Sequence, residues 1–466
     1  MVAPTSPIPQ KETKLNGLPH GISAEEEEKL WGSYPALRPR HHRERLQHFI
    51  SLEFALARLL AGWVPACGNL EWKLELPRFL FEHMQHARRL RERLEELPGG
   101  TGTIAASPSI QSFIQAIGPA EHGASYVRGY IDHTLPALAQ AYQDYLARCD
   151  EIFDAPTIYV LRPLVTAHME LIERGRRLLD SHALPITDEA AQDKYLAHVQ
   201  ACLEKVDRLR PLAPDAKVTF PASPVRTPGG PCPQQRSQDP RLRLREGFPT
   251  TKEANPTRLT LREIVYHDAT EWQVIDPMCE VFYGIPKMPM DFFVDFSRHI
   301  WDECRHSRMG LRRLREFGYE PFRDFEWTHS PARLEVCEDY FAGLTLVGEA
   351  CSFTRKKGSI AYFLKAGDPR SAMLPEVDCV DEQLHVGFGH KWVTTMYKLV
   401  KGQDFEKEAI ARQCRRETID QYMKSDVEGD ARQFLARMDE KSRNALVNTF
   451  SGFCGAVEFN MDLTLL

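Results

Sequence analysis

Apolar residues recur every three or four positions over two long parts of this chain. In the first part, residues 41–207, segments such as RLQHFISLEFALARLLAGW and ELPRFLFEHMQHARRLRERL show this spacing. The spacing is that of an α-helix with one buried face, so this part is predicted to be a helical N-terminal domain.

The second part predicts a four-helix bundle over residues 258–402. Its helical stretches cover 258–283, 290–317, 331–364 and 371–400. Gly or Pro stands at the junctions YGIPKMPMD, FGYEPF and KAGDPRS, where helices are expected to stop and start. Accessory helices over 404–424 and 428–450, within residues 403–466, are expected to pack outside the bundle or mediate association. The predicted fold class is all-α.

Two segments lack a pattern that could bury a core. Residues 1–40 contain Pro, Gly and the glutamate run Glu25–Glu28, which predicts a flexible lead-in. Residues 208–257 are rich in Pro, Gly, Ser and Arg and predict an inter-domain linker. A structureless connection of that length is expected to lie along a surface or to reach a partner.

Composition excludes several classes of protein but does not indicate a function. The 466 residues are 42% hydrophobic and carry a formal net charge of −6, so charge gives no indication of nucleic-acid binding. Eleven cysteines without a C-x-x-C pair argue against a disulfide framework or a zinc ribbon. The N-terminus has no apolar signal region, and no uninterrupted apolar run approaches about 20 residues. We expect a soluble cytoplasmic protein with no membrane contact.

The second and fourth bundle helices carry the same short motif. It reads Asp302-Glu303-Cys304-Arg305-His306 in one and Asp381-Glu382-Gln383-Leu384-His385 in the other. Side chains at i and i+3 project from one face of a helix, so each Glu and His can bind one metal ion together. Two such pairs predict two ions.

The other two helices supply a glutamate each, Glu271 and Glu349. Glu303 follows Glu271 by 32 positions and Glu382 follows Glu349 by 33, which places each glutamate opposite its partner's motif. This is the ligand pattern of di-iron and di-manganese carboxylate bundles. The predicted metal ligands are Glu271, Glu303, His306, Glu349, Glu382 and His385, and the metal centre itself is the predicted catalytic group.

Four neighbouring residues are expected to support the ligands. Metal-bound imidazoles usually donate their other N–H group to a carboxylate, a role predicted for Asp302 and Asp381. Arg305 could then hold a buried aspartate, and His267, four residues before Glu271, is expected to lie behind the ligands.

Two alternatives stay open from the residues alone. Glu263, two turns before Glu271, could replace it in a displaced register. The buried Glu and His residues could also pair with one another structurally, although burying four carboxylates without cations would be costly.

At these residues the chain resembles known di-iron proteins. D-E-C-R-H is similar to the D-E-x-R-H motif of bacterial multicomponent monooxygenases, and HDATEW, GEACSF and DEQLHVGFGHKW resemble a bacterial branch of the ferritin-like superfamily related to the tRNA hydroxylase MiaE. The resemblance covers residues 258–400. It implies a ferritin-like bundle with the six predicted ligands and O₂ activation to hydroxylate, N-oxygenate or desaturate a substrate. The added N-terminal domain departs from this pattern and leaves the substrate open.

The N-terminal domain could be a degenerate copy of the same bundle. Aligning residues 81–94 on 301–314 places His86 on His306 but His83 on Glu303, which removes the bridging carboxylate. Glu53, 33 positions before His86, lies roughly where Glu271 lies before His306, and residues 154–175 could supply the fourth helix. In such a copy we expect a packing role, in preference to metal binding, for the histidines at positions His83, His86 and His168.

We therefore expect a di-iron oxygenase that acts on a small organic substrate. The expected cofactor is two Fe ions, with a Mn/Fe pair as the alternative because imidazole-carboxylate sites accept several first-row ions. O₂ is the expected co-substrate, an external electron donor is required, and a homodimer is left open. The alternatives are a ferroxidase or iron-handling protein without an organic substrate, and a non-catalytic protein that metal stabilises.

Overall fold

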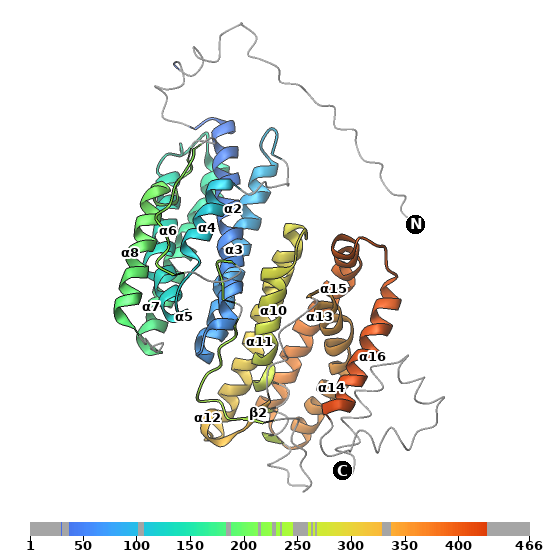
Figure 1. The fold of residues 1–466 in the computed structure, drawn as a ribbon. Helices are drawn as coiled ribbons and strands as arrows, with labels where there is room; N and C mark the ends of the chain where they lie inside the picture. Colours follow the sequence, from blue (N-terminus) through green and yellow to red (C-terminus); the bar gives the residue numbers. More distant parts are fainter. Residues whose placement is uncertain are drawn as a thin grey trace, which may run out of the picture.

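In a computed structural model, the chain forms two helical bundles that pack side by side (Figure 1). The structure describes residues 29, 37–100, 107–182, 188–212, 216–225, 230–233, 235–245, 260–261, 264–265, 268–328 and 337–425. Strands in these residues are limited to β1 (Leu244–Arg245) and β2 (Trp327–Thr328), a short parallel pair. The predicted all-α class is confirmed.

The N-terminal bundle has four long helical segments with shorter helices packed on them. The long segments are α2 (Pro39–Trp63), α3 (Leu70–Glu95), α5–η2–α6 (Gly123–Gly129, Tyr130–Thr134, Leu135–Leu146) and α7 (Ala155–Ser181). The shorter elements are η1 (Val64–Ala66), α4 (Pro108–Ile117), α8 (Glu189–Lys205) and η3 (Asp207–Leu209).

The C-terminal bundle repeats this layout. Its long segments are α10 (Trp272–Gly284, preceded by η4, Ala269–Glu271), α11 (Met290–Glu316), α13–η5–α14 (Cys337–Gly343, Leu344–Gly348, Glu349–Lys365) and α15 (Pro369–Lys401). Two smaller helices, α12 (Pro321–Asp324) and α16 (Lys407–Ser425), flank it. In both bundles the third segment contains a π turn, η2 in one and η5 in the other. The common layout supports the duplication, which stays a prediction.

Local sequence sets the ends of the longest helix, α15. The Asp368 side chain accepts a hydrogen bond from the Ser371 N–H group (3.0 Å), and Pro369 occupies the first helical position. At the other end Gly402 adopts φ +70°, the left-handed conformation that glycine tolerates. The observed range agrees closely with the predicted helix over 371–400.

The predicted helix over 258–283 differs from the structure near Glu271. Asp268 lies in a turn, η4 is a 3₁₀ turn, and α10 begins only at Trp272. The reason is a tertiary contact: Ser307 donates a hydrogen bond to the Ala269 carbonyl (2.8 Å), and a Cβ at Gly310 would lie 2.3 Å from the Ala269 nitrogen. This close approach requires glycine at position 310 and bends the chain before α10. The predicted helix over 428–450 lies outside the described residues. So does the lead-in predicted over 1–40, except for residue 29 and residues 37–40, the last two of which begin α2.

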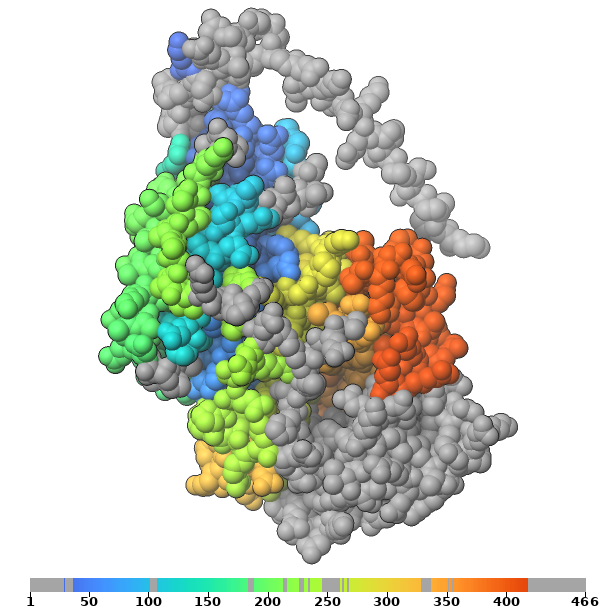
Figure 2. All heavy atoms as spheres, in the orientation of Figure 1, coloured from blue at the N-terminus to red at the C-terminus, as the bar shows by residue number. Residues whose placement is uncertain are grey.

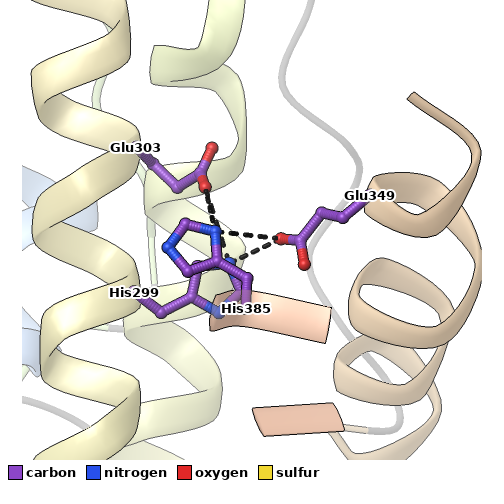
Figure 3. A group of neighbouring side chains, drawn as sticks. All are labelled: His299, Glu303, Glu349 and His385. Atoms are coloured by element: carbon purple, nitrogen blue, oxygen red, sulfur yellow. Dashed lines mark hydrogen bonds and ion pairs between the residues drawn. The ribbon is translucent and has the colours of Figure 1, made fainter. Parts of the chain in front are cut away.

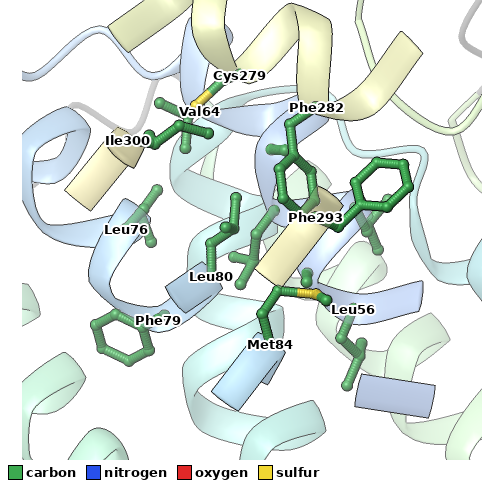
Figure 4. Close-up of a cluster of buried hydrophobic side chains, with 14 of the residues drawn as sticks. Leu56, Val64, Leu76, Phe79, Leu80, Met84, Cys279, Phe282, Phe293 and Ile300 are labelled. Carbon is green, nitrogen blue, oxygen red and sulfur yellow. The ribbon is translucent and has the colours of Figure 1, made fainter. Parts of the chain in front are cut away.

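An apolar core joins the two bundles. Leu56, Leu80 and Met84 from the N-terminal bundle pack near Phe282 and Phe293 from the C-terminal bundle (Figure 4). Because α3 contacts α11 and α2 contacts α10, the first two helices of each bundle form one shared layer. Burial of large apolar side chains makes this interface part of a continuous core.

Two ion-pair groups lie at the same interface, one buried and one partly exposed. The Lys73 ammonium lies 2.7 Å from the Asp276 carboxylate, and both side chains are buried. Glu75 of α3 pairs with Arg308 of α11 (2.5 Å) and with Arg174 of α7. These contacts join α3 to both α10 and α11.

The linker runs along the surface of both bundles, and part of it is visible in yellow-green in Figure 2. Asp239 accepts a hydrogen bond from the Leu70 N–H group at the start of α3 (2.9 Å). Arg236 forms an ion pair with Glu280 of α10 (2.7 Å). The linker, predicted to lie along a surface or to reach a partner, therefore connects the two bundles along the surface where it is described.

Among the residues that the structure describes, one helix has the length and hydropathy of a membrane span, residues 39–66, but 78% of its apolar window is buried inside the protein. The Leu52, Leu56 and Leu60 side chains on it are fully buried. This degree of burial is that of a core helix.

The Lys73–Asp276 pair provides a test of the interface. Replacing Lys73 by Met leaves a buried carboxylate without its cation, so we expect the free energy of unfolding to fall by about 3–5 kcal/mol. The double variant Lys73→Met/Asp276→Leu removes both charges and should recover most of the loss. Denaturant unfolding measures all three proteins. Equal stabilities of the single and double variants would contradict this interpretation of the pair.

Candidate metal centre

Eight side chains converge inside the C-terminal bundle, in groups whose ligand atoms lie within 4.8 Å of one another. They come from η4, α11, α14 and α15, so every long segment contributes. The side chains are Glu271, His299, Glu303, His306, Glu349, Asp378, Glu382 and His385. The structure thus brings all six predicted ligands together and adds two, His299 and Asp378.

The two added residues follow the same helical spacing as the predicted ones. His299 lies four positions before Glu303, and Asp378 lies four positions before Glu382. Each helix therefore presents three ligands at i, i+4 and i+7 on one buried face. The sequence analysis gave His299 no role and did not consider Asp378, although this periodicity could have found both.

One half of the centre gathers around two stacked imidazoles. The His299 and His385 rings lie 3.8 Å apart, with an interplanar angle of 21° (Figure 3). His299 Nε2 lies 2.5 Å from Glu349 Oε1, and His385 Nδ1 lies 3.3 Å from Glu303 Oε1. Two nitrogen donors and two carboxylates thus face one another across three helices.

The other half gathers around His306. Its Nδ1 atom lies 3.0 Å from Glu271 Oε2 and 3.3 Å from Asp378 Oδ1. Glu382 forms a group with Glu271 and Asp378 and also lies 3.6 Å from His385 Nδ1 in the first half. Glu303 likewise belongs to groups in both halves. Glu303 and Glu382 are therefore the carboxylates placed to bridge two ions.

The predicted supporting aspartates act across the bundle. Asp302 of α11 accepts from His385 Nε2 of α15 (3.3 Å), and Asp381 of α15 accepts from His306 Nε2 of α11 (3.1 Å). Arg305 forms ion pairs with both aspartates, and Arg298, which the sequence analysis missed, does the same. His306 and His385 thus keep Nδ1 directed toward the centre because their Nε2 atoms are held by aspartates.

Local backbone features position the two glutamates outside the motifs. Glu349 directly follows the π turn η5. This turn packs closely on α15 at Gly389, where a Cβ would lie only 2.4 Å from the Thr345 hydroxyl oxygen. π turns are frequent at functional sites because they redirect a side chain. Glu271 ends the 3₁₀ turn η4 that packs on Gly310. Glu263 and His267 lie outside the described residues.

A buried lysine, Lys356, also enters the cluster. Its ammonium lies 2.5 Å from Asp378, 2.6 Å from Glu382 and 3.8 Å from Glu271. It lies on α14 seven positions after Glu349, on the same helix face. Despite the opposing effect of burial, Lys356 helps to lower the pKa of Glu382 to about 2.

The surroundings of Glu271 and Glu303 shift the pKa values of these two carboxyl groups in opposite directions. Burial raises the pKa of Glu271 well above its usual range, and nearby Asp378 adds to the shift. Burial also acts to raise the pKa of Glu303, but hydrogen bonds from His299 and His385 hold it well below its usual range. The metal-free cluster therefore retains protons that bound metal would displace.

The donor set fits two divalent ions. Once metal has displaced these protons, five carboxylates against one ammonium leave four negative charges, which two divalent ions would cancel. Buried ligand atoms including Glu303 Oε1, Glu382 Oε2 and His385 Nδ1 have no well-formed hydrogen bond within the described residues. Buried polar atoms are normally paired, so this group of atoms fits a bound cation.

Fold and site together define a class: an all-α protein of paired helical bundles with buried His/Glu clusters that could hold a metal ion. The chain belongs to the family described as "Protein of unknown function (DUF455)", whose model matches residues 198–441. The match includes the linker, all eight clustered residues and α16. No curated protein and no solved structure matches the chain.

The bridging positions predict the metal content. Replacing Glu303 or Glu382 by Ala removes a carboxylate that belongs to both halves, so we expect the bound metal to fall from two ions to one or none. Elemental analysis after dialysis measures this. Glu316→Ala, at the exposed end of α11, is the matched control and should keep both ions. Full metal content in both Glu303→Ala and Glu382→Ala would discard the assignment.

Removing the Lys356 ammonium is expected to strengthen metal binding, whereas removing a bridging carboxylate weakens it. Replacing it by Met removes a positive charge beside the carboxylates, so a second divalent ion should bind at least about tenfold more tightly, about 1.4 kcal/mol. The metal-free variant should be less stable than the wild type because its carboxylates lose their cation. Calorimetric titration with Mn²⁺ measures the affinity, with exposed Lys357→Met as control. Weaker binding in Lys356→Met would show that the lysine supports metal binding.

Proposed function

We propose that this chain is an O₂-dependent oxidoreductase that uses two iron ions to oxygenate a small organic substrate. The proposal rests on the positions of Glu303 and Glu382, because each carboxylate lies close to ligand atoms of both halves of the centre. Carboxylates in this position between Glu-x-x-His helices are the bridging ligands of ferritin-like di-iron bundles. The proposal includes that ferritin-like assignment.

In this proposal each half holds one ion. His299, Glu349 and His385 would hold the first, and Glu271, His306 and Asp378 the second, with Glu303 and Glu382 shared. Bound as a ferrous pair, the ions would supply the electrons that begin the reduction of O₂. A Mn/Fe pair would use the same donors.

The proposed reaction needs two electrons from another protein or from a small reductant. Hydroxylation converts R–H, O₂, two electrons and two protons into R–OH and water, and no side chain of the centre is a two-electron donor. An external electron donor is therefore part of the proposal. No disulfide joins the nine cysteines whose side chains the structure describes, and a reducing compartment such as the cytoplasm is part of the proposal.

The chain's own residues would control access and water. Phe296 packs edge-on against His299 (5.8 Å) and against Phe341 (5.1 Å), which makes an apolar wall on that side. Glu271 is the most exposed of the eight side chains, at 15%, whereas Glu303 and Glu349 are 5% exposed. We propose that O₂ and a small substrate approach from the Glu271 side.

Iron handling without an organic substrate is the second candidate. A cavity of about 1440 Å³ lies between α2, α4 and the turn from α10 to α11, and none of the eight clustered residues lines it. This separation favours chemistry limited to metal and O₂. The additional bundle and linker exceed what a storage subunit needs and favour an enzyme.

Rapid mixing separates the two candidates. The iron-loaded, reduced protein mixed with O₂ should consume about one O₂ per pair of ions and give a transient absorbance whose decay a substrate accelerates. Glu303→Ala should lower the rate at least about 100-fold. Stopped-flow absorbance and an oxygen electrode follow the reaction.

Two results would redirect the assignment. Continued turnover with excess Fe²⁺ that deposits ferric mineral would indicate iron handling. Two tightly bound ions with no O₂ consumption would contradict both candidates and leave a metal-stabilised protein.

A further inference from the structure

A second buried cluster of metal-binding side chains lies in the N-terminal bundle. Glu53 of α2, His86 of α3 and His168 of α7 each offer a ligand atom, and these atoms lie within 4.8 Å of one another. All three side chains are at most 1% exposed. The cluster shares no residue with the centre in the C-terminal bundle.

The spacing of these donors suits one ion. His168 Nε2 lies 3.0 Å and His86 Nδ1 lies 3.5 Å from the same oxygen, Glu53 Oε1. Two donors bound at about 2.0–2.1 Å to one tetrahedral zinc ion lie about 3.3 Å apart. The two imidazole rings meet edge-on, with centroids 4.5 Å apart. Small side-chain shifts would therefore place the three donors at three corners of a tetrahedron around one ion.

His86 argues against a purely structural hydrogen-bond network. Neither of its ring nitrogens has a hydrogen-bond partner within the described residues, although the ring is buried. Buried imidazoles are normally paired, because an unpaired polar atom loses its bonds to water without compensation. Burial, with the neighbouring His168, lowers the pKa of His86 to about 4.

The remaining neighbours orient the carboxylate. His83 Nδ1 forms a short hydrogen bond with Glu53 Oε2, and His83 Nε2 lies 2.5 Å from the Tyr130 hydroxyl. The Tyr142 hydroxyl donates to Glu53 Oε1 (2.7 Å). A ligating carboxylate held by outer partners in this way is typical of metal sites.

We propose that Glu53, His86 and His168 bind a single first-row divalent ion of the Zn²⁺ type, as a structural site that ties α2, α3 and α7 together. The site takes one ion because His83 stands where the C-terminal bundle has the bridging Glu303. Its three side chains are at most 1% exposed, so the site has no opening for a substrate.

The test measures zinc in the full-length chain. Wild-type protein dialysed against Zn²⁺ should retain one more equivalent than His86→Phe, and Zn²⁺ should raise the Tm of the wild type more than that of the variant. Glu303→Ala, which disrupts only the C-terminal centre, should still bind the equivalent that His86→Phe loses. His133→Ala, a half-buried histidine of the same bundle outside the cluster, is the matched control.

Equal zinc content in folded His86→Phe and the wild type would overturn the proposal. Circular dichroism establishes whether the variant is folded. If it is not, anomalous scattering at the zinc edge from crystals of the unmodified chain decides the question. A peak between His86 and His168 supports the site, and no peak there overturns it.

Discussion

Charge compensation is the constraint on which this structure depends. Five carboxylates are brought together in a bundle interior where each would pay a large desolvation cost alone, and Lys356 supplies one positive charge for the five. Asp302 and Asp381 are balanced separately by Arg298 and Arg305. The excess of four negative charges makes the bundle interior a site for multivalent cations.

The rest of the fold holds these groups in position. Helix α11 carries three of the ligands and is fixed on one side by the apolar core and ion pairs that join it to α3. The η4 turn packs on Gly310, and the π turn η5 precedes Glu349, so the two ligands outside the motifs are placed by irregular backbone. The N-terminal bundle thus acts as a rigid support for the site.

Periodicity predicted the class of the fold and the residues that converge, because a buried helix face repeats every three to four positions. The same rule would have found His299 and Asp378 had it been extended one turn toward the N-terminus of each motif. Other features depend on tertiary contacts and could not be predicted. The break before α10 follows from Ala269 packing on Gly310. The spacing of Lys356 from Glu349 predicts a shared helix face, but the placement of its ammonium between Asp378 and Glu382 depends on how α14 packs on α15.

Anomalous scattering at the iron edge, from crystals of the iron-loaded chain, tests the central claim most directly. Two peaks about 3.5–4 Å apart, with Glu303 and Glu382 between them, are the predicted result. A single peak, or iron bound only at the surface with Lys356 still between Asp378 and Glu382, would contradict a dinuclear centre.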